Sequence, residues 1–337
     1  GSGVIQYNGN STIAGNLTVE EGTLHGYDYN NSELTVTGDV TVESGGTLGV
    51  SNQTGACSFG SLTINSGGTY IATSGTTTIT DEGSDGVCLR SNGTFTHNSG
   101  LVSIQTADHT TLVWSSASQR FNNLTVNLGA SARVCTLSGQ FDSHRYVEGD
   151  FTVTNCKFDT NNAGTFRIDG DVSLTSSATL TCGTSAISLG SLTINSGGTY
   201  SATSGTTTIT NQTGGGYGWY NVSGGTFTHN DGLVKFTDNA SVYCQENTFY
   251  DLELNLSSVS LEFRWSDISG NTLNILNDFT ISSGRFKFNT AGDGIIVHGL
   301  TKLKSTSQYG LNSPSGTHTF NGLVTLTGGT WYLSKVT

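Results

Sequence analysis

Apolar and polar residues alternate in short segments along the whole chain. Residues 17–19, 40–42 and 62–64 each consist of a threonine between two aliphatic residues. Side chains of a β-strand point alternately to its two faces, so we expect the aliphatic pair to point inward and the threonine outward. A helical period of 3.6 residues never persists beyond a turn or two. The pattern therefore predicts an all-β protein.

The segments belong to a short repeat, G-[N/D/S]-[L/V/F]-T-[V/I], followed by a turn that contains Gly or Ser. Clear copies begin at Gly15, Gly38, Gly60, Gly149, Gly170 and Gly190. With looser copies included, most intervals are about 20–26 residues, the length of one coil of a parallel β-helix. Such a coil buries its apolar side only by stacking on its neighbours. We predict a single-stranded parallel β-helix (β-solenoid) of roughly 13–15 coils.

A longer repeat is superimposed on the short one. Residues 60–80 return at 190–210 with a single change, Ile71 against Ser201. Two more pairs of similar segments are 93–102 with 225–234 and 121–128 with 249–256. We predict one continuous solenoid over residues 1–337, with an internal duplication of about 130 residues: copies at about 15–157 and 158–287 and a partial third copy at 288–337.

Composition narrows the choice of partners. Only 11% of residues are charged and the net charge is −12, which argues against nucleic acid because that binding depends on Lys and Arg. No run of eighteen apolar residues occurs, so we expect no membrane insertion. The chain contains no Met, so we expect that it was processed or cut from a longer protein, with Gly1–Gly3 as an expression remnant being the alternative.

Six cysteines admit two interpretations, buried free thiols or disulfides. They are Cys57, Cys88, Cys135, Cys156, Cys182 and Cys244. Alignment of the long copies places Cys57 opposite Ile187, Cys88 opposite Trp219 or Tyr220, and Cys135 opposite Phe263. Positions that accept such residues are typical of a core, so we favour free thiols. No C-x-x-C spacing indicates a metal site.

The sequence contains none of the common motifs for catalysis, nucleotide binding or metal binding. It contains no G-x-S-x-G, Walker, H-E-x-x-H or EF-hand pattern. Two acidic pairs, Glu20-Glu21 and Asp81-Glu82, are adjacent in sequence and so diverge in a strand, and the second becomes Asn211-Gln212 in the other copy. His97 and His229 recur because the scaffold recurs. We therefore predict no catalytic residue, no metal, no cofactor and no enzymatic activity.

One aromatic cluster stands out, GGGYGWY, which contains Tyr217, Trp219 and Tyr220. Aromatic rings can stack on sugars, so the cluster is the candidate for glycan binding, but core packing of at least one ring is the favoured alternative.

The strings GTFTHN-x-GLV, F-x-NLTVN and GSLTINSGGTY resemble the Gly/Ser/Thr-rich β-strand-repeat surface proteins of bacteria and archaea. The resemblance covers most of the chain. It implies a secreted β-solenoid at the cell surface or in extracellular material, with a role as a fibre or adhesin, and it implies no catalytic residues.

Neither end of the repeat array has a recognisable cap, although solenoids usually protect their terminal coils. We therefore expect the ends to complete each other in successive copies, which builds a head-to-tail filament. The expected assembly residues are Val4, Ile5, Tyr7, Leu323, Val324, Trp331, Tyr332 and Leu333. The alternatives are a surface adhesin or glycan-binding fragment of a longer solenoid and, less favoured, a polysaccharide-degrading β-helix enzyme.

Overall fold

The computed structural model describes residues 3–26, 31–115, 119–139, 145–162, 164–211, 216–238, 240–244, 248–265, 270–288, 290, 292–311 and 316–332. These residues form β-strands and no helix. In the first half of the chain the strands are β1 (Val4–Tyr7), β2 (Ser11–Ile13), β3 (Leu17–Val19), β4 (Gly22–Gly26), β5 (Leu34–Val36), β6 (Val40–Val42), β7 (Gly46–Leu48), β8 (Cys57–Phe59), β9 (Leu62–Ile64), β10 (Thr69–Ile71), β11 (Thr76–Ile79), β12 (Val87–Ser91), β13 (Thr94–Thr96), β14 (Leu101–Ile104), β15 (Thr110–Trp114), β16 (Arg120–Phe121), β17 (Asn123–Asn127), β18 (Val134–Ser138), β19 (Arg145–Val147), β20 (Phe151–Thr154), β21 (Lys157–Asp159) and β22 (Thr165–Thr175).

The second half continues with strands of the same kind. They are β23 (Thr179–Thr181), β24 (Ala186–Ile194), β25 (Thr199–Ser201), β26 (Thr206–Ile209), β27 (Tyr217–Asn221), β28 (Thr226–Thr228), β29 (Leu233–Phe236), β30 (Ala240–Cys244), β31 (Thr248–Phe249), β32 (Asp251–Asn255), β33 (Glu262–Trp265), β34 (Thr272–Ile275), β35 (Phe279–Phe288), β36 (Gly294–Val297), β37 (Thr301–Leu311), β38 (His318–Phe320), β39 (Val324–Thr327) and β40 (Thr330–Trp331).

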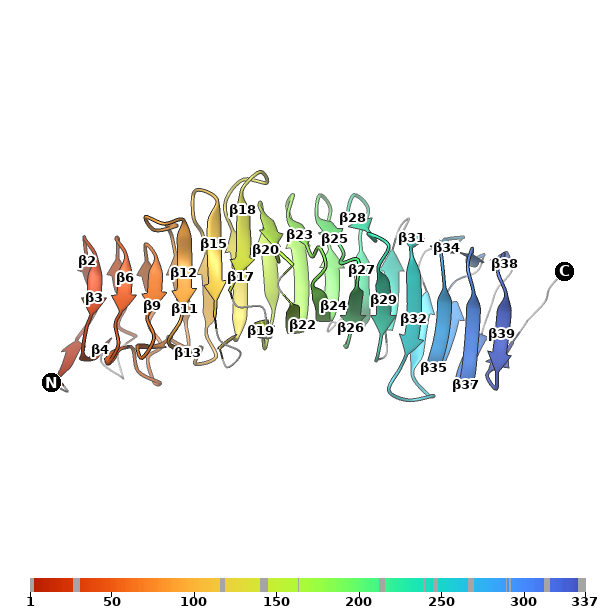
Figure 1. Ribbon diagram of the computed structural model, residues 1–337, viewed down its shortest axis with the longest axis horizontal. Coiled ribbons are helices and arrows are strands. Elements are labelled where there is room, and N and C mark those ends of the chain that lie inside the picture. The colour runs from red at the N-terminus through yellow and green to blue at the C-terminus, as the bar shows by residue number, and fades with distance from the viewer. Residues whose placement is uncertain are drawn as a thin grey trace. The chain divides into compact units, whose positions relative to one another are not determined.

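The chain divides into two compact units. Unit 1 comprises Gly1–Ile168 and Ser177–Thr181, and unit 2 comprises Asp169–Ser176 and Cys182–Thr337. In each unit, strands that lie about one coil apart in sequence pair side by side (Figure 1). All the strand pairs that the structure describes are parallel, as the sequence pattern requires.

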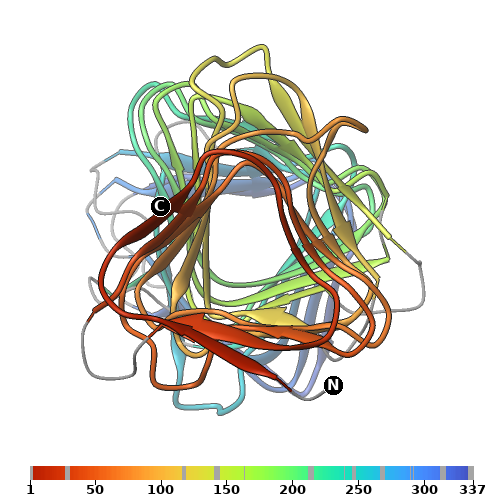
Figure 2. The ribbon, with the colours of Figure 1, turned by 90° about the vertical axis from the view of Figure 1, so that its left-hand side faces the viewer.

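Each coil contributes up to three strands, one to each of three stacks. In unit 1, for example, β1 pairs with β4, β2 with β5, and β3 with β6. Seen end-on, the first coils of this unit turn through three sides (Figure 2). The chain forms an all-β parallel β-solenoid of about 13 turns with about 23 residues per coil, which confirms the predicted fold.

The alternation of residues along each strand also follows the prediction. Val40 and Val42 are fully buried, and Thr41 between them is half-buried on the outer face. Many of the buried rings contact one another along the core: in unit 1, Tyr70 contacts Phe59 at 5.9 Å and Phe95 at 5.7 Å between ring centroids. Because each coil is only one strand thick, its apolar residues gain full burial only between two neighbouring coils.

The polar second position of the short repeat has a structural role that the sequence pattern alone does not reveal. At three positions its side-chain oxygen accepts a hydrogen bond from the backbone N–H of the corresponding residue one coil later. Such bonds join Asp39 to Asn16 (2.9 Å), Asp150 to Asn123 (2.7 Å) and Asp278 to Asp251 (2.8 Å). Asn16, Asn123 and Asp251 thus satisfy a backbone N–H group at a corner where the strand ladder is interrupted. Where the residue one coil later is Ser, its hydroxyl donates to the Asp carboxylate instead, as Ser61 does to Asp39 at 2.7 Å.

The Gly-Gly turn of both long copies has a conformational cause. Gly67 has φ of 86° and its counterpart Gly197 has φ of 78°, a region that is costly for residues with a Cβ atom. At the next position, a Cβ atom on Gly68 would lie 2.6 Å from the carbonyl oxygen of Val42. The sequence NSGGTY recurs because this turn accepts only glycine at both positions.

Candidate functional site

The first coil of unit 1 presents an open end, which we call the N-terminal end face: strands β1, β2 and β3. Among the described pairings, each of these strands pairs on one side only. Ile5 lies in register with Leu24, which pairs in turn with the buried Leu48, so it continues an inward row. It is nonetheless 69% exposed, and the neighbouring Val4 is 65% exposed. The face therefore combines unpaired backbone with an uncovered apolar layer.

Tyr7, the third predicted assembly residue of this face, is half-buried. Its hydroxyl accepts a hydrogen bond from Gln53 Nε2 at 2.6 Å. Burial, reinforced by Cys57 nearby, raises the pKa of Tyr7 to about 12. Tyr7 thus belongs partly to the core beneath the face.

The last described coil of unit 2 presents the corresponding C-terminal end face: strands β38, β39 and β40. Val324 and Leu326 lie in register with the fully buried Thr301 and Leu303, yet they are 37% and 51% exposed. Leu323 is 67% exposed. These residues occupy inward or adjacent positions that a further coil would cover.

Aromatic residues complete the C-terminal end face. Trp331 pairs in register with the buried Tyr309, with 4.7 Å between ring centroids, and it contacts Phe320 at 4.9 Å. Tyr332 is 43% exposed. The remaining predicted assembly residue, Leu333, lies outside the described residues.

The aromatic cluster of β27 is divided between core and surface. Trp219 is fully buried and packs against Phe227 at 4.8 Å and Phe249 at 5.5 Å. Tyr217 and Tyr220 are half-buried, with ring centroids 5.1 Å apart. Trp219 therefore serves as a core residue, the alternative that the sequence favoured, and only the two tyrosines remain on the outer side.

The strand registers correct one alignment between the two copies. Leu62 pairs with Leu89, and its counterpart Leu192 pairs with Trp219. Trp219 therefore corresponds to Leu89, and the predicted match of Cys88 to Trp219 or Tyr220 is wrong by one or two residues.

The shift has a local cause. The ladder is irregular between Val87 and Leu89 and again between Tyr217 and Trp219, so two consecutive residues point inward at each place. In unit 1 the extra inward residue is Cys88, and in unit 2 it is Gly218. In unit 1 the bulge lies within the apolar run Val87–Leu89, whose sequence does not say which residues point inward.

The described cysteines are buried free thiols, as the sequence favoured. They are Cys57, Cys88, Cys135, Cys156 and Cys182. The side chain of Cys244 lies outside the described residues. Thr77 pairs with Cys57 and its counterpart Thr207 pairs with Ile187, so the alignment of Cys57 with Ile187 is confirmed. Thr110 pairs with Cys135 and its counterpart Ala240 pairs with Phe263, so the alignment of Cys135 with Phe263 is also confirmed.

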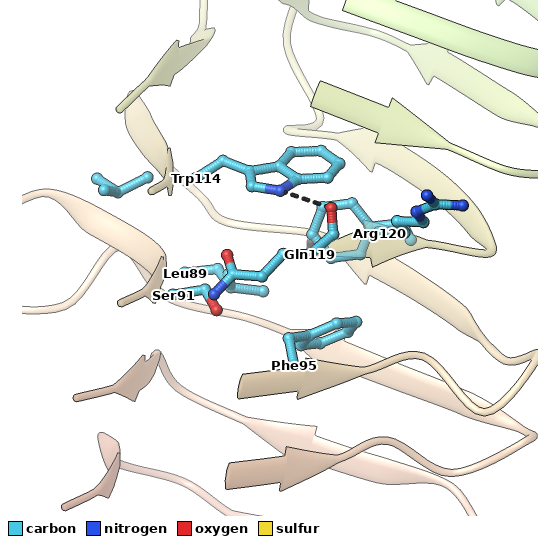
Figure 3. Close-up of a pocket in the computed structure, with 8 residues that line it drawn as sticks. Leu89, Ser91, Phe95, Trp114, Gln119 and Arg120 are labelled. Carbon is cyan, nitrogen blue, oxygen red and sulfur yellow. Dashed lines mark hydrogen bonds between the residues drawn. The ribbon is translucent and has the colours of Figure 1, made fainter. Parts of the chain in front are cut away.

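The cavity in Figure 3 lies inside unit 1, under Trp114 and Gln119. The indole Nε1 of Trp114 donates a hydrogen bond to the backbone oxygen of Gln119 at 3.0 Å. The cavity volume is about 10 Å³, which is the room of a single water molecule. A cavity of this size cannot hold an organic substrate.

A larger hollow opens on the surface of unit 1 beside this cavity, and we call it the His97 hollow. Its volume is about 310 Å³, and it is lined by Thr94, Phe95, Thr96, His97, Gln119 and Arg120. Glu148 joins two of these residues, with His97 Nε2 at 3.3 Å and Arg120 Nη1 at 3.1 Å from its carboxylate oxygens. No pattern in the sequence indicated this cluster.

The acidic pairs lie on the surface: Glu20 and Glu21 are exposed, and the carboxylate of Asp81 accepts a hydrogen bond from the backbone N–H of Glu82 at 2.8 Å. Among the described residues, no group of three or more His, Cys, Asp or Glu side chains could hold a metal ion.

Comparisons with protein-family models, with curated proteins and with solved structures found no match to this chain. A search of the described residues for a helix long and apolar enough to cross a membrane also found none.

Proposed function

We propose that the protein is a structural subunit of an extracellular filament or surface fibre, in which the N-terminal end face of one copy stacks on the C-terminal end face of the next. The carrying observation is the pair of open end faces. Each offers parallel strands that are paired on one side only and an apolar layer in register with a buried core. A second copy is an occupant that supplies both missing features at once, because its own first coil has the same strand direction and period.

The charges of the two ends support this occupant. Residues 1–89 contain nine Asp or Glu and no Lys or Arg, and residues 294–337 contain three Lys and no Asp or Glu. Opposite charge near the two ends favours the head-to-tail encounter and disfavours head-to-head contact, where acidic ends would meet. A heterologous contact of this kind propagates into a filament unless the rotation closes a ring.

The mechanism of such a subunit is mechanical. Backbone hydrogen bonds and the apolar core would continue through each junction, so the fibre would resist bending and proteolysis. The extracellular setting rests on the resemblance of the repeats to surface proteins.

Electron microscopy over a range of protein concentrations tests the proposal. We expect filaments at low salt and slower growth at high salt, because salt screens the attraction of the ends. Ile5→Asp places a charge in the apolar layer of the junction and should abolish filaments. Val259→Asp is the matched control: Val259 is 46% exposed and lies outside both end faces. Discrete particles at every concentration would contradict the proposal.

A second candidate function, glycan binding by an adhesin, is favoured only by Tyr217 and Tyr220 on the outer side of β27. A glycan array on which wild type and Tyr217→Ala/Tyr220→Ala bind equally, or not at all, would exclude these rings as the platform.

A further inference from the structure

The strand ladder of unit 1 is interrupted between β13 and β16. β13 pairs with β10 and β16 pairs with β19, but the described pairings include none between β13 and β16. Unit 2 is interrupted at the equivalent place: β28 pairs with β25 and β31 with β34, and the described pairings include none between β28 and β31. The interruption therefore belongs to the long repeat, and polar groups beside it need hydrogen-bond partners other than a neighbouring strand.

In unit 1 the side chain of Gln119 supplies one such partner. Gln119 directly precedes β16, and its side chain reaches back to the preceding coil, where Nε2 donates a hydrogen bond to the backbone oxygen of Gly93. The indole of Trp114 holds the backbone of Gln119 in place. Because Nε2 is bound to Gly93, the position of the other amide atom, Oε1, is also determined.

Two polar atoms of the cavity in Figure 3 remain to be satisfied. Ser91 and Gln119 both line this cavity, and each is only 3% exposed. Among the described residues, neither Oγ of Ser91 nor Oε1 of Gln119 has a hydrogen-bond partner. A buried polar atom without a partner is costly, so two of them at one cavity indicate a partner that they share.

The size and chemistry of the cavity select water as that partner. Its volume of about 10 Å³ is the room of one water molecule. A water molecule can accept a hydrogen bond from the Ser91 hydroxyl and donate one to Oε1 of Gln119. Of the described residues that line the cavity, only Arg120 is charged, and its guanidinium group is paired with Glu148 at 3.1 Å. The cavity therefore offers little to an ion.

Unit 2 solves the same problem with a larger side chain. Ser91 and Asn221 are equivalent, because each pairs with the isoleucine of its LTI strand. Asn221 is buried, and its Oδ1 lies beside Gly225, the counterpart of Gly93: a Cβ atom on Gly225 would lie 2.2 Å from it. Unit 2 thus brings a carboxamide to this glycine from the position of Ser91 itself. In unit 1 the carboxamide comes from Gln119, and the shorter serine leaves room beside it.

We propose that a buried water molecule binds between Ser91 Oγ and Gln119 Oε1 and links two successive coils where the strand ladder is interrupted. Ser91 belongs to β12 and Gln119 to the following coil, so the water adds a bridge between coils to the direct bond from Gln119 to Gly93. The site lies inside unit 1 and does not depend on filament formation.

A crystal structure of the full chain, at a resolution that shows ordered water, tests the proposal. We expect one peak of electron density within about 2.7–3.2 Å of both Ser91 Oγ and Gln119 Oε1. A cavity without a peak, or a direct hydrogen bond between the two side chains, would overturn the inference. An anomalous signal at the peak would overturn its assignment to water.

Two variants test which residues hold the water. Ser91→Asn/Gln119→Asn gives unit 1 the residues of the second copy, Asn221 and Asn247, and should remove the peak while the midpoint of thermal unfolding stays near that of the wild type. Ser91→Ala keeps the room but removes one partner, and should lower the midpoint by about 1–3 °C. A peak that persists in the double variant, or an unchanged midpoint for Ser91→Ala, would contradict the assigned partners. If the double variant does not fold, the density of the wild type decides.

Discussion

The two copies of the duplicated segment, residues 60–80 and 190–210, form the same internal contacts in different surroundings. The hydroxyl groups of Tyr70 and Thr77 are 2.8 Å apart, as are those of Tyr200 and Thr207. Both tyrosines are fully buried in their units. The near-identical sequence thus produces an identical buried polar pair twice.

The neighbouring coils differ, and they fill the core in different ways. In unit 1 the residue that follows the bulge is Leu89, and the bulge adds the thiol of Cys88. In unit 2 the counterparts are Trp219 and Gly218, so a large ring occupies the first position and the second position has no side chain. The comparison shows that a coil determines its own internal hydrogen bonds, whereas neighbouring coils together determine which side chains fill the core.

The largest expected effect on the free energy of unfolding comes from replacing Trp219. Trp219→Ala removes a fully buried ring that packs against Tyr200, Phe227 and Phe249, and should cost about 4–5 kcal/mol of unfolding free energy. Leu89→Ala, its counterpart, should cost about 2–4 kcal/mol because fewer contacts are lost. Urea unfolding monitored by circular dichroism measures both losses. Equal losses would show that the two cores are filled equivalently.

The next largest effect comes from replacing Gly218, the inward glycine of unit 2. A Cβ atom on Gly218 would lie 2.8 Å from the Cβ atom of Ala240, so Gly218→Ala should overpack the core of unit 2 and cost about 1–3 kcal/mol. Ala240→Gly in the same chain should recover part of that loss, because it removes the atom in conflict. Thermal unfolding of the single and double variants tests this, and a neutral Gly218→Ala would mean that the bulge can relax.

Loss of the buried Tyr–Thr hydrogen bond should cost the same in both copies of the duplicated segment. Tyr70→Phe and Tyr200→Phe each leave a buried threonine hydroxyl without its partner, and each should cost about 1–2 kcal/mol. Tyr70→Phe combined with Thr77→Val removes both partners and should be closer to wild type. Unequal costs for the two tyrosines in denaturant titrations would show that the neighbouring coils modulate this bond.

Much of the fold could be predicted because the repeat encodes it directly. Alternation in segments such as 40–42 specifies which side is buried, and the interval between copies specifies the coil length. Several end-face residues could be named for the same reason, since Ile5 and Val324 follow the inward period of their strands, whereas Leu326, which is also exposed, was not among the predicted residues.

The register between coils could not be predicted, because it depends on turn lengths that vary. Arg120 and Tyr146 are 26 residues apart and Tyr146 and Arg167 are 21 apart, yet both pairs lie side by side. No fixed period brings these three residues together, so their place side by side in successive coils could not be predicted from the sequence. The bulge at Cys88 was missed because Val87, Cys88 and Leu89 are all apolar, so the sequence does not say which of them point inward.

The smallest expected effect at neutral pH is that of Cys57→Ile, which gives unit 1 the residue that unit 2 has at this place. Cys57 and Ile187 occupy equivalent core positions beside Thr77 and Thr207, so the exchange should change the unfolding free energy by about 1 kcal/mol or less at pH 7. Above pH 9 the two proteins should diverge.

This divergence follows from the ionisation of the Cys57 thiol. Burial raises the pKa of Cys57 from 9.0 to about 11, with hydrogen bonds from Tyr70 and the backbone of Leu34 opposing the change. The folded protein therefore keeps its proton where the unfolded chain releases it, so the contribution is complete below pH 9 and is lost as pH rises toward 11. Wild type should lose about 1 kcal/mol more than Cys57→Ile by pH 10. Parallel curves of unfolding free energy against pH for the two proteins would mean that the thiol ionises in the folded state as readily as in the unfolded chain.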